Sequence, residues 1–131
     1  MALTDYSLFT LKLLAALGCG LIAGVFFAFS TFVMKALAQQ PPAQGITTMQ
    51  SINITVINPW FMTAFLGTSI ICLVLLVLAL LKWQHPSAVY LLVGSLLYLL
   101  GSFGVTLVFN VPLNDALAVV KPDSPEGTTL W

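Results

Sequence analysis

The chain has 131 residues, of which 60% are hydrophobic and only 6% are charged, and its mean hydropathy is +1.06. Because soluble domains carry about 25% charged residues, this composition excludes an ordinary water-soluble domain and indicates an integral membrane protein. Four lysines balance four acidic residues and arginine is absent, so the chain has no basic surface that could bind a nucleic acid.

Three stretches of 22 residues carry no charge, at 13–34, 60–81 and 88–109. As a helix, each stretch is about 33 Å long, which matches a hydrocarbon core about 30 Å thick. The run 70–78 is apolar at every position, whereas strands of a membrane barrel alternate apolar and polar residues. We therefore predict an all-α membrane protein with three transmembrane helices, at about 8–37, 60–82 and 87–109.

The first helix could instead be a cleaved signal sequence, because the small residues Ala36 and Ala38 follow its apolar run. This run is longer than the roughly 7 to 15 residues of a signal peptide, and no positive residue precedes position 8, so we expect the helix to be retained. Small residues also recur every four positions along it and predict a face for close helix packing. They are Ala16, Gly20, Gly24 and Ala28.

The segment between the first two helices begins with Pro41 and Pro42, which end the first helix. Apolar residues then recur at helical spacing from Ile46 to Val56. We predict a short interfacial helix at about 46–57, and the second membrane helix begins after Asn58.

Polar residues on the third helix follow one another at intervals of seven, four and four, and they are Ser95, Ser102, Thr106 and Asn110. A polar stripe on a membrane helix faces protein, a ligand or a water-filled cavity, and hydrogen bonding between helices is the simpler of these interpretations. We expect the chain to leave the membrane after residue 109 and to finish in a polar tail at 116–131, so that residues 1–131 form one membrane domain.

Three crossings place the loop after the first helix and the segment after the third helix on the same side of the membrane. The polar residues that this side collects are Lys35, Gln50, Asn53, Asn58, Asn110, Asn114 and Asp115. The two sides carry two lysines each, and the position of Lys82 in a short loop favours a cytoplasmic amino terminus.

Amides, one lysine and one carboxylate define the chemistry of this side. An amide can orient a phenol or hold an oxyanion, Asp115 can accept a proton, and Lys35 can stabilise a phenolate. We predict catalytic roles for Asn110, Asn114 and Asp115, and substrate-binding roles for Asn53, Asn58, Gln50, Lys35 and Thr106. Alternatively, the two catalytic asparagines only cap the end of the third helix and Asp115 only begins the next segment.

Metal sites and a serine–histidine–acid relay have little support in the sequence. The chain has one histidine, His85, and its two cysteines have no metal-ligand spacing. His85 and Asp115 emerge on opposite sides of the membrane, which excludes a catalytic relay between them. We therefore predict no cofactor and no metal, and we expect no disulfide between Cys19 and Cys72.

Three blocks of the chain resemble the anthrone oxygenase-like family of small membrane proteins: 24–34, 49–53 with 58–59, and 110–114. The resemblance implies oxidation of polyketide anthrones to anthraquinones without a metal or flavin, although most bacterial relatives have no assigned function. It also implies that Asn53, Asn58, Asn110 and Asn114 are shared polar positions. Relatives continue past a tryptophan equivalent to Trp131 into a fourth membrane helix, so the resemblance implies a remnant or part of a four-helix bundle.

Together these observations predict an integral membrane oxidoreductase that acts on a lipid-soluble aromatic or quinone-like substrate. The alternative is a non-enzymatic accessory or assembly subunit of a larger membrane complex. We expect a bacterial plasma membrane location, contact with the lipid bilayer, and assembly into a homo-oligomer or a larger complex.

Overall fold

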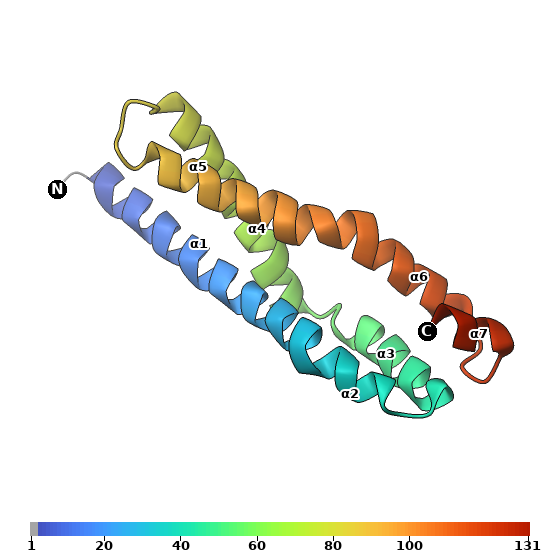
Figure 1. Ribbon diagram of the computed structural model, residues 1–131. Coiled ribbons are helices and arrows are strands. Elements are labelled where there is room, and N and C mark those ends of the chain that lie inside the picture. The colour runs from blue at the N-terminus through green and yellow to red at the C-terminus, as the bar shows by residue number, and fades with distance from the viewer. Residues whose placement is uncertain (1–2) are drawn as a thin grey trace.

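The computed structural model describes residues 3–131, which form a bundle of helices (Figure 1). The first membrane helix is one continuous rod made of α1 (Leu3–Ala28), the π-helical segment η1 (Phe29–Val33) and α2 (Met34–Ala38). The second membrane helix is α4 (Pro59–Leu81). It begins at Asn58, whose side-chain oxygen accepts a hydrogen bond from Phe61 N at 3.0 Å and so caps the helix.

The third membrane helix joins α5 (Ala88–Leu96), the π-helical segments η2 (Leu97–Gly104) and η3 (Thr106–Asn110), and α6 (Val111–Val119). Within the described part of the chain, three segments are long and apolar enough to cross a membrane: Tyr6–Ala38, Pro59–Leu81 and Ala88–Val119. No strand occurs among residues 3–131. The predicted all-α membrane class and its three membrane helices are therefore confirmed.

The third helix is longer than predicted, because it continues to Val119 and does not end at residue 109. Asn110 and Asn114 lie inside this helix, so they do not cap its end. Pro112 directly follows η3 within this continuous helix and removes one backbone donor from it. Of the tail predicted at 116–131, residues 116–119 belong to α6 and Pro125–Leu130 form α7.

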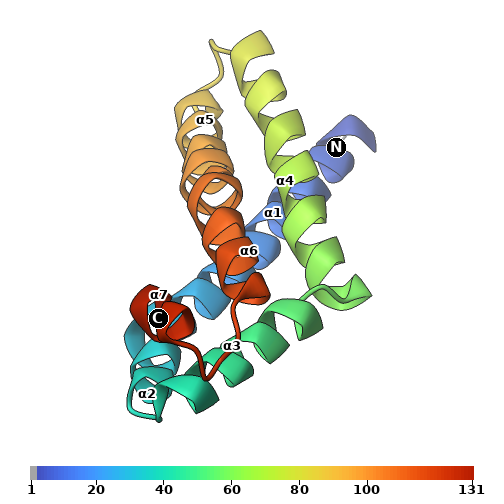
Figure 2. The same ribbon diagram turned by 90° about the vertical axis from the view of Figure 1, so that its right-hand side faces the viewer.

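The segment between the first two membrane helices is the helix α3 (Pro42–Thr55), which starts four residues before the predicted position. Pro42 occupies its first turn, so the prolines that end the first membrane helix also begin the next one. Figure 2 shows α3 lying across the end of the bundle, beneath α6 and next to the start of α4.

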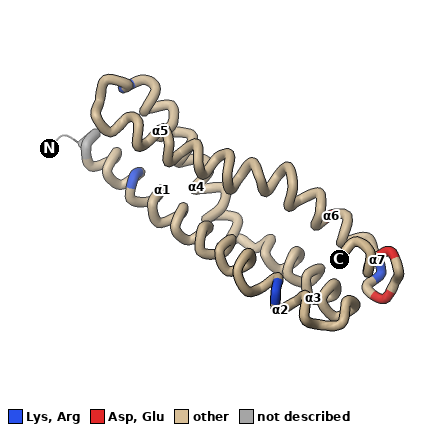
Figure 3. Tube along the Cα trace, in the orientation of Figure 1, with Lys and Arg blue, Asp and Glu red and all other residues tan. Residues whose placement is uncertain are grey.

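The helices divide the bundle into two ends, as the count of crossings predicts. The start of α1 and the α4–α5 connection lie at one end, and α2, α3, α6 and α7 lie at the other, which we call the amide end (Figure 1). The charged residues of the described chain lie towards the two ends and leave the middle of the bundle without charge (Figure 3). This distribution suits a membrane span, since a charge at mid-membrane is costly.

The core of the bundle lies where α4 packs between α1 and the third membrane helix. Its buried residues are Ile22, Phe65, Cys72 and Tyr98. The face that α1 turns towards α4 contains Ala15, Gly18 and Ile22. The predicted small-residue face lies beside this one, and Gly20 and Gly24 have open space next to their Cα atoms. The prediction of close packing there is wrong within this chain, because α4 makes its close contact at Gly18 and leaves Gly20 and Gly24 uncovered.

A second, smaller cluster holds the carboxyl-terminal residues against α3. Leu37, Ile46 and Leu117 are buried at the amide end. Trp131 packs on Gly45, where an added Cβ would lie 2.8 Å from the indole ring. This cluster attaches α7 to the bundle, so the last residues are part of the folded domain.

Candidate functional site

The polar stripe on the third membrane helix faces the inside of the bundle. Ser102, Thr106, Asn110 and Asn114 are all half-buried. By contrast, Val108 and Phe109 beside them are 65% and 61% exposed. The stripe is therefore available to a ligand or to other parts of the chain, as the sequence predicts for polar residues in a membrane helix.

The π-helical segments explain how residues spaced by four stay on one face over this length. In an α-helix, each step of four residues advances by about 40° around the axis, so three steps from Ser102 to Asn114 would turn by about 120°. The segments η2 and η3 have i→i+5 hydrogen bonds and therefore more residues per turn than an α-helix. Each residue in them advances by a smaller angle around the axis, which offsets part of this turn of about 120°. Nothing in the residue pattern indicated these segments, and π-helical turns are frequent at functional sites.

Gln50 connects α3 to the end of α6. Its Nε2 atom donates to Leu117 O at 2.8 Å and to Val120 O at 3.0 Å. Leu117 is in the last turn of α6 and Val120 directly follows that helix, so the helix itself provides no donor for these carbonyls. The amide of Gln50 thus has a structural role, and it locates the point where α3 and α6 touch.

Asn53 and Asn114 flank this contact. Asn53 lies one turn after Gln50 on the same face of α3, and Asn114 lies one turn before Leu117 on α6. The Nδ2 atom of Asn53 is buried and has no hydrogen-bond partner among residues 3–131. Leaving a buried donor unpaired costs about 1–3 kcal/mol, so this atom is a strong candidate for pairing with a ligand.

Asn58 and Thr106 have partners within their own segments. The Nδ2 atom of Asn58 donates to Thr55 O at 3.0 Å, and its oxygen caps α4, so the side chain joins α3 to α4. Thr106 Oγ1 donates to Ser102 O at 2.7 Å within the third helix. To bind a substrate as predicted, Asn58 and Thr106 would have to bond to it in addition to these local partners, or in their place.

Lys35 and Asp115 are both exposed at the amide end, Lys35 on α2 and Asp115 on α6. Neither side chain lies within the buried contact between α3 and α6. The part of the predicted site that the fold turns inward is therefore the group Asn53, Asn110 and Asn114.

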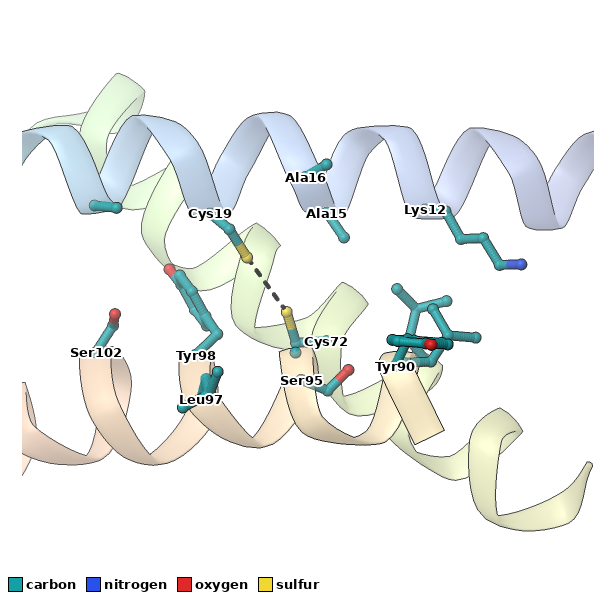
Figure 4. A pocket seen from close by; sticks show the side chains of 14 residues that line it. Lys12, Ala15, Ala16, Cys19, Cys72, Tyr90, Ser95, Leu97, Tyr98 and Ser102 are labelled. Atoms are coloured by element: carbon teal, nitrogen blue, oxygen red, sulfur yellow. Dashed lines mark hydrogen bonds between the residues drawn. The ribbon is translucent and has the colours of Figure 1, made fainter. Parts of the chain in front are cut away.

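A cleft of about 440 Å³, which the residue pattern did not predict, lies between α1 and the third membrane helix (Figure 4). Lys12 and Tyr90 lie at one end of this cleft and Ser102 at the other. The cleft shares Ser95 and Ser102 with the polar stripe, and none of the asparagines lines it. The small residues on its α1 side are Ala15, Ala16 and Ala23, and only Ala16 belongs to the small-residue face predicted from the sequence.

Two thiols and one phenol lie midway along this cleft. Cys19 Sγ and Cys72 Sγ are 3.9 Å apart, and both cysteines are free (Figure 4). The hydroxyl group of Tyr98 donates to Phe65 O at 3.0 Å, which links the third membrane helix to α4. These contacts use the polar atoms mainly to hold helices together.

Comparison with known proteins identifies a family for more than half of the chain. Residues 61–131 match the profile of the family described as Anthrone oxygenase. The match includes Thr106, Asn110, Asn114 and Asp115, whereas Asn53 lies before it. No curated protein and no solved structure matches the chain.

Proposed function

Because the chain belongs to the anthrone oxygenase family, we propose that it oxidises a lipid-soluble anthrone to an anthraquinone with molecular oxygen, using amide side chains at the amide end. Support comes chiefly from one observation, the buried and unpartnered Nδ2 atom of Asn53 beside the contact of α3 with α6.

The proposed reaction balances with oxygen as the only co-substrate. The CH₂ group of the central ring loses a proton, and the resulting carbanion is delocalised onto the ring oxygen as a phenolate. Addition of O₂ to the carbon and return of the proton give a hydroperoxide, which loses water and leaves a ketone. One oxygen atom enters the anthraquinone and the other leaves as water.

Amide donors suit the first step, since they stabilise the negative charge that develops on the ring oxygen. An asparagine donates through Nδ2 and cannot act as a base at neutral pH. In this proposal Asn53, Asn110 and Asn114 hold the oxyanion, in a setting where water is scarce and hydrogen bonds to charge are strong. Asp115 is exposed at the same end of the bundle, so in this proposal it takes up the released proton through water, and the exposed Lys35 contributes only at longer range.

The test replaces Asn110 and Asn114 with alanine, singly and together, in membranes that contain the full chain. Removing one oxyanion donor typically lowers kcat about 100-fold to 1000-fold, so we expect a loss of that size in anthrone-dependent oxygen uptake and anthraquinone formation. Gln44→Ala is the matched control, because Gln44 is an exposed amide on α3.

Membranes without the protein supply the rate of spontaneous anthrone oxidation, and extraction at alkaline pH checks insertion of every variant. Turnover in the double variant equal to that of the unaltered protein would refute the assignment of these amides. If Asn53→Ala alone left turnover unchanged, the role of the buried donor would be refuted separately.

A non-enzymatic role in a membrane complex is the second candidate, and one observation favours it. Gly20 and Gly24 present open, small-residue surface on α1, a feature that membrane helices use to pack on one another. Purification in a mild detergent followed by mass measurement distinguishes the two, since this role requires larger partners in fixed ratio.

A further inference from the structure

The cleft between α1 and the third membrane helix is separate from the group Asn53, Asn110 and Asn114. The proposed oxidation of an anthrone gives this cleft no role. Its floor is formed by α4 through Cys72 and Leu75, and its walls are mostly apolar. Its volume of about 440 Å³ falls within the roughly 300–1,000 Å³ of small-molecule sites. An occupant must therefore be largely apolar.

One end of the cleft is polar and lies near the start of two membrane helices. Lys12 is six residues inside the first span, and Tyr90 is two residues inside the third. Figure 4 shows both side chains at this end, with Tyr90 on the wall opposite Lys12. A lysine at this depth extends its amine to the headgroup region while its stem covers apolar surface.

Lys12 has no ion-pair partner among the described residues. Three of the four acidic residues, Asp115, Asp123 and Glu126, belong to the opposite end of the bundle. The cleft thus presents a lysine that no described acidic residue pairs with, and a phenol O–H donor, at headgroup level above an apolar channel.

The dimensions of the cleft match one leaflet of a bilayer. From Lys12 to Ala23, which both line it, the α1 wall spans eleven residues, or about 16 Å at 1.5 Å per residue. This is about half of a 30 Å hydrocarbon core. An elongated cleft of this length suits an acyl chain better than a compact ring system.

We propose that this cleft is a binding site for an anionic phospholipid, with one acyl chain between α1 and the third helix and the phosphate held by Lys12 and Tyr90. The acyl chain of the lipid contacts Ala16, Ala23 and Leu97 in place of other lipid tails, and the lipid headgroup stays in water. The charge of Lys12 provides selectivity for anionic over zwitterionic lipids. This inference is independent of the proposed oxidation, because it uses none of the asparagines.

The experiment measures lipid retention by the purified full chain with native mass spectrometry. The protein is released from nanodiscs that contain equal amounts of phosphatidylglycerol and phosphatidylcholine. We expect about one retained lipid per chain, with phosphatidylglycerol preferred. Lys12→Gln should lower that preference about fivefold, the effect expected for one lysine near an anionic surface. Lys82→Gln, which changes an exposed lysine at the same end, should leave it unchanged.

A second pair of variants tests the acyl channel without touching the charge. Gly94 lines the cleft and has no atom within 4 Å of an added Cβ, so Gly94→Leu fills the channel without a backbone clash. We expect it to abolish retention of both lipids. Gly20→Leu is the matched control, because Gly20 also has open space around it and does not line the cleft.

Circular dichroism confirms that each variant keeps its helical content. Equal retention of the two lipids by the unaltered protein would overturn the proposal, as would retention in Gly94→Leu equal to that in Gly20→Leu. In a parallel arm, oleate is added to the nanodiscs that contain both phospholipids. Displacement of phosphatidylglycerol by equimolar oleate would show a free fatty-acid site and would also overturn the assignment to a phospholipid.

Discussion

Replacing Gly18 with alanine tests the helix packing on which the architecture depends. A Cβ at Gly18 would overlap Thr68 Oγ1 and lie 3.1 Å from both Thr68 Cβ and Thr68 Cγ2. Thr68 is buried in α4, and rotation of its side chain leaves its own Cβ atom 3.1 Å from the added Cβ. Gly18→Ala should therefore push α1 away from α4.

Two opposing contributions determine how much Gly18→Ala changes the free energy of unfolding. Overpacking a tight contact costs about 1–3 kcal/mol, and the higher helix propensity of alanine returns up to about 1 kcal/mol. Gly20→Ala gains only the second term, because nothing lies within 4 Å of its added Cβ. The two variants should differ in free energy of unfolding by about 1–3 kcal/mol, with Gly18→Ala the less stable.

The assay is reversible unfolding in mixed detergent and dodecyl sulfate, followed by circular dichroism. Combining Gly18→Ala with Thr68→Ala removes the overlapping oxygen and should restore most of the lost stability. If Gly18→Ala proved as stable as Gly20→Ala, the packing of α1 on α4 described here would be wrong.

Two further variants test individual hydrogen bonds. Tyr98→Phe removes the hydrogen bond to Phe65 O. It should lower the free energy of unfolding by about 0.6 kcal/mol and at most about 1.7 kcal/mol, the range for polar contacts between membrane helices. An unchanged unfolding curve would argue against that bond. Gln50→Leu leaves the last carbonyls of α6 without their donor, and limited proteolysis should then cut the segment 120–124 faster than in the Gln44→Leu control. Equal cleavage rates in these two variants would show that Gln50 does not hold the end of α6.

The positions of the membrane helices could be predicted because the cost of burying charge in lipid acts on each residue separately. Uncharged runs of sufficient length leave few alternatives to a membrane helix. The end of the third helix was predicted wrongly because its polar residues favour a position outside the membrane helix. Asn110, Asn114 and Asp115 resemble an exit from the membrane, but the asparagines turn inward and α3 satisfies the end of α6.

The candidate site was predictable by residue type and side of the membrane only. Gln50, Asn53 and Asn58 are amides within nine residues of one another, and the sequence assigns them one role. In the fold, Gln50 caps α6, Asn58 caps α4 and Asn53 is left buried without a partner. Such differences depend on which backbone atoms come within hydrogen-bond distance, and no local pattern encodes that.

By itself, then, the sequence determined the membrane environment, the number of crossings and the side on which the amides gather, because hydropathy and chain parity need no knowledge of packing. Only the tertiary structure decided that α1 packs through Gly18 and not through Gly20, that the third helix contains π-helical segments, and that a cleft opens beside Lys12. These features depend on how the side chains of neighbouring helices fit together. A small rotation of a helix about its axis would bring a different residue into the contact and leave the first one facing open space.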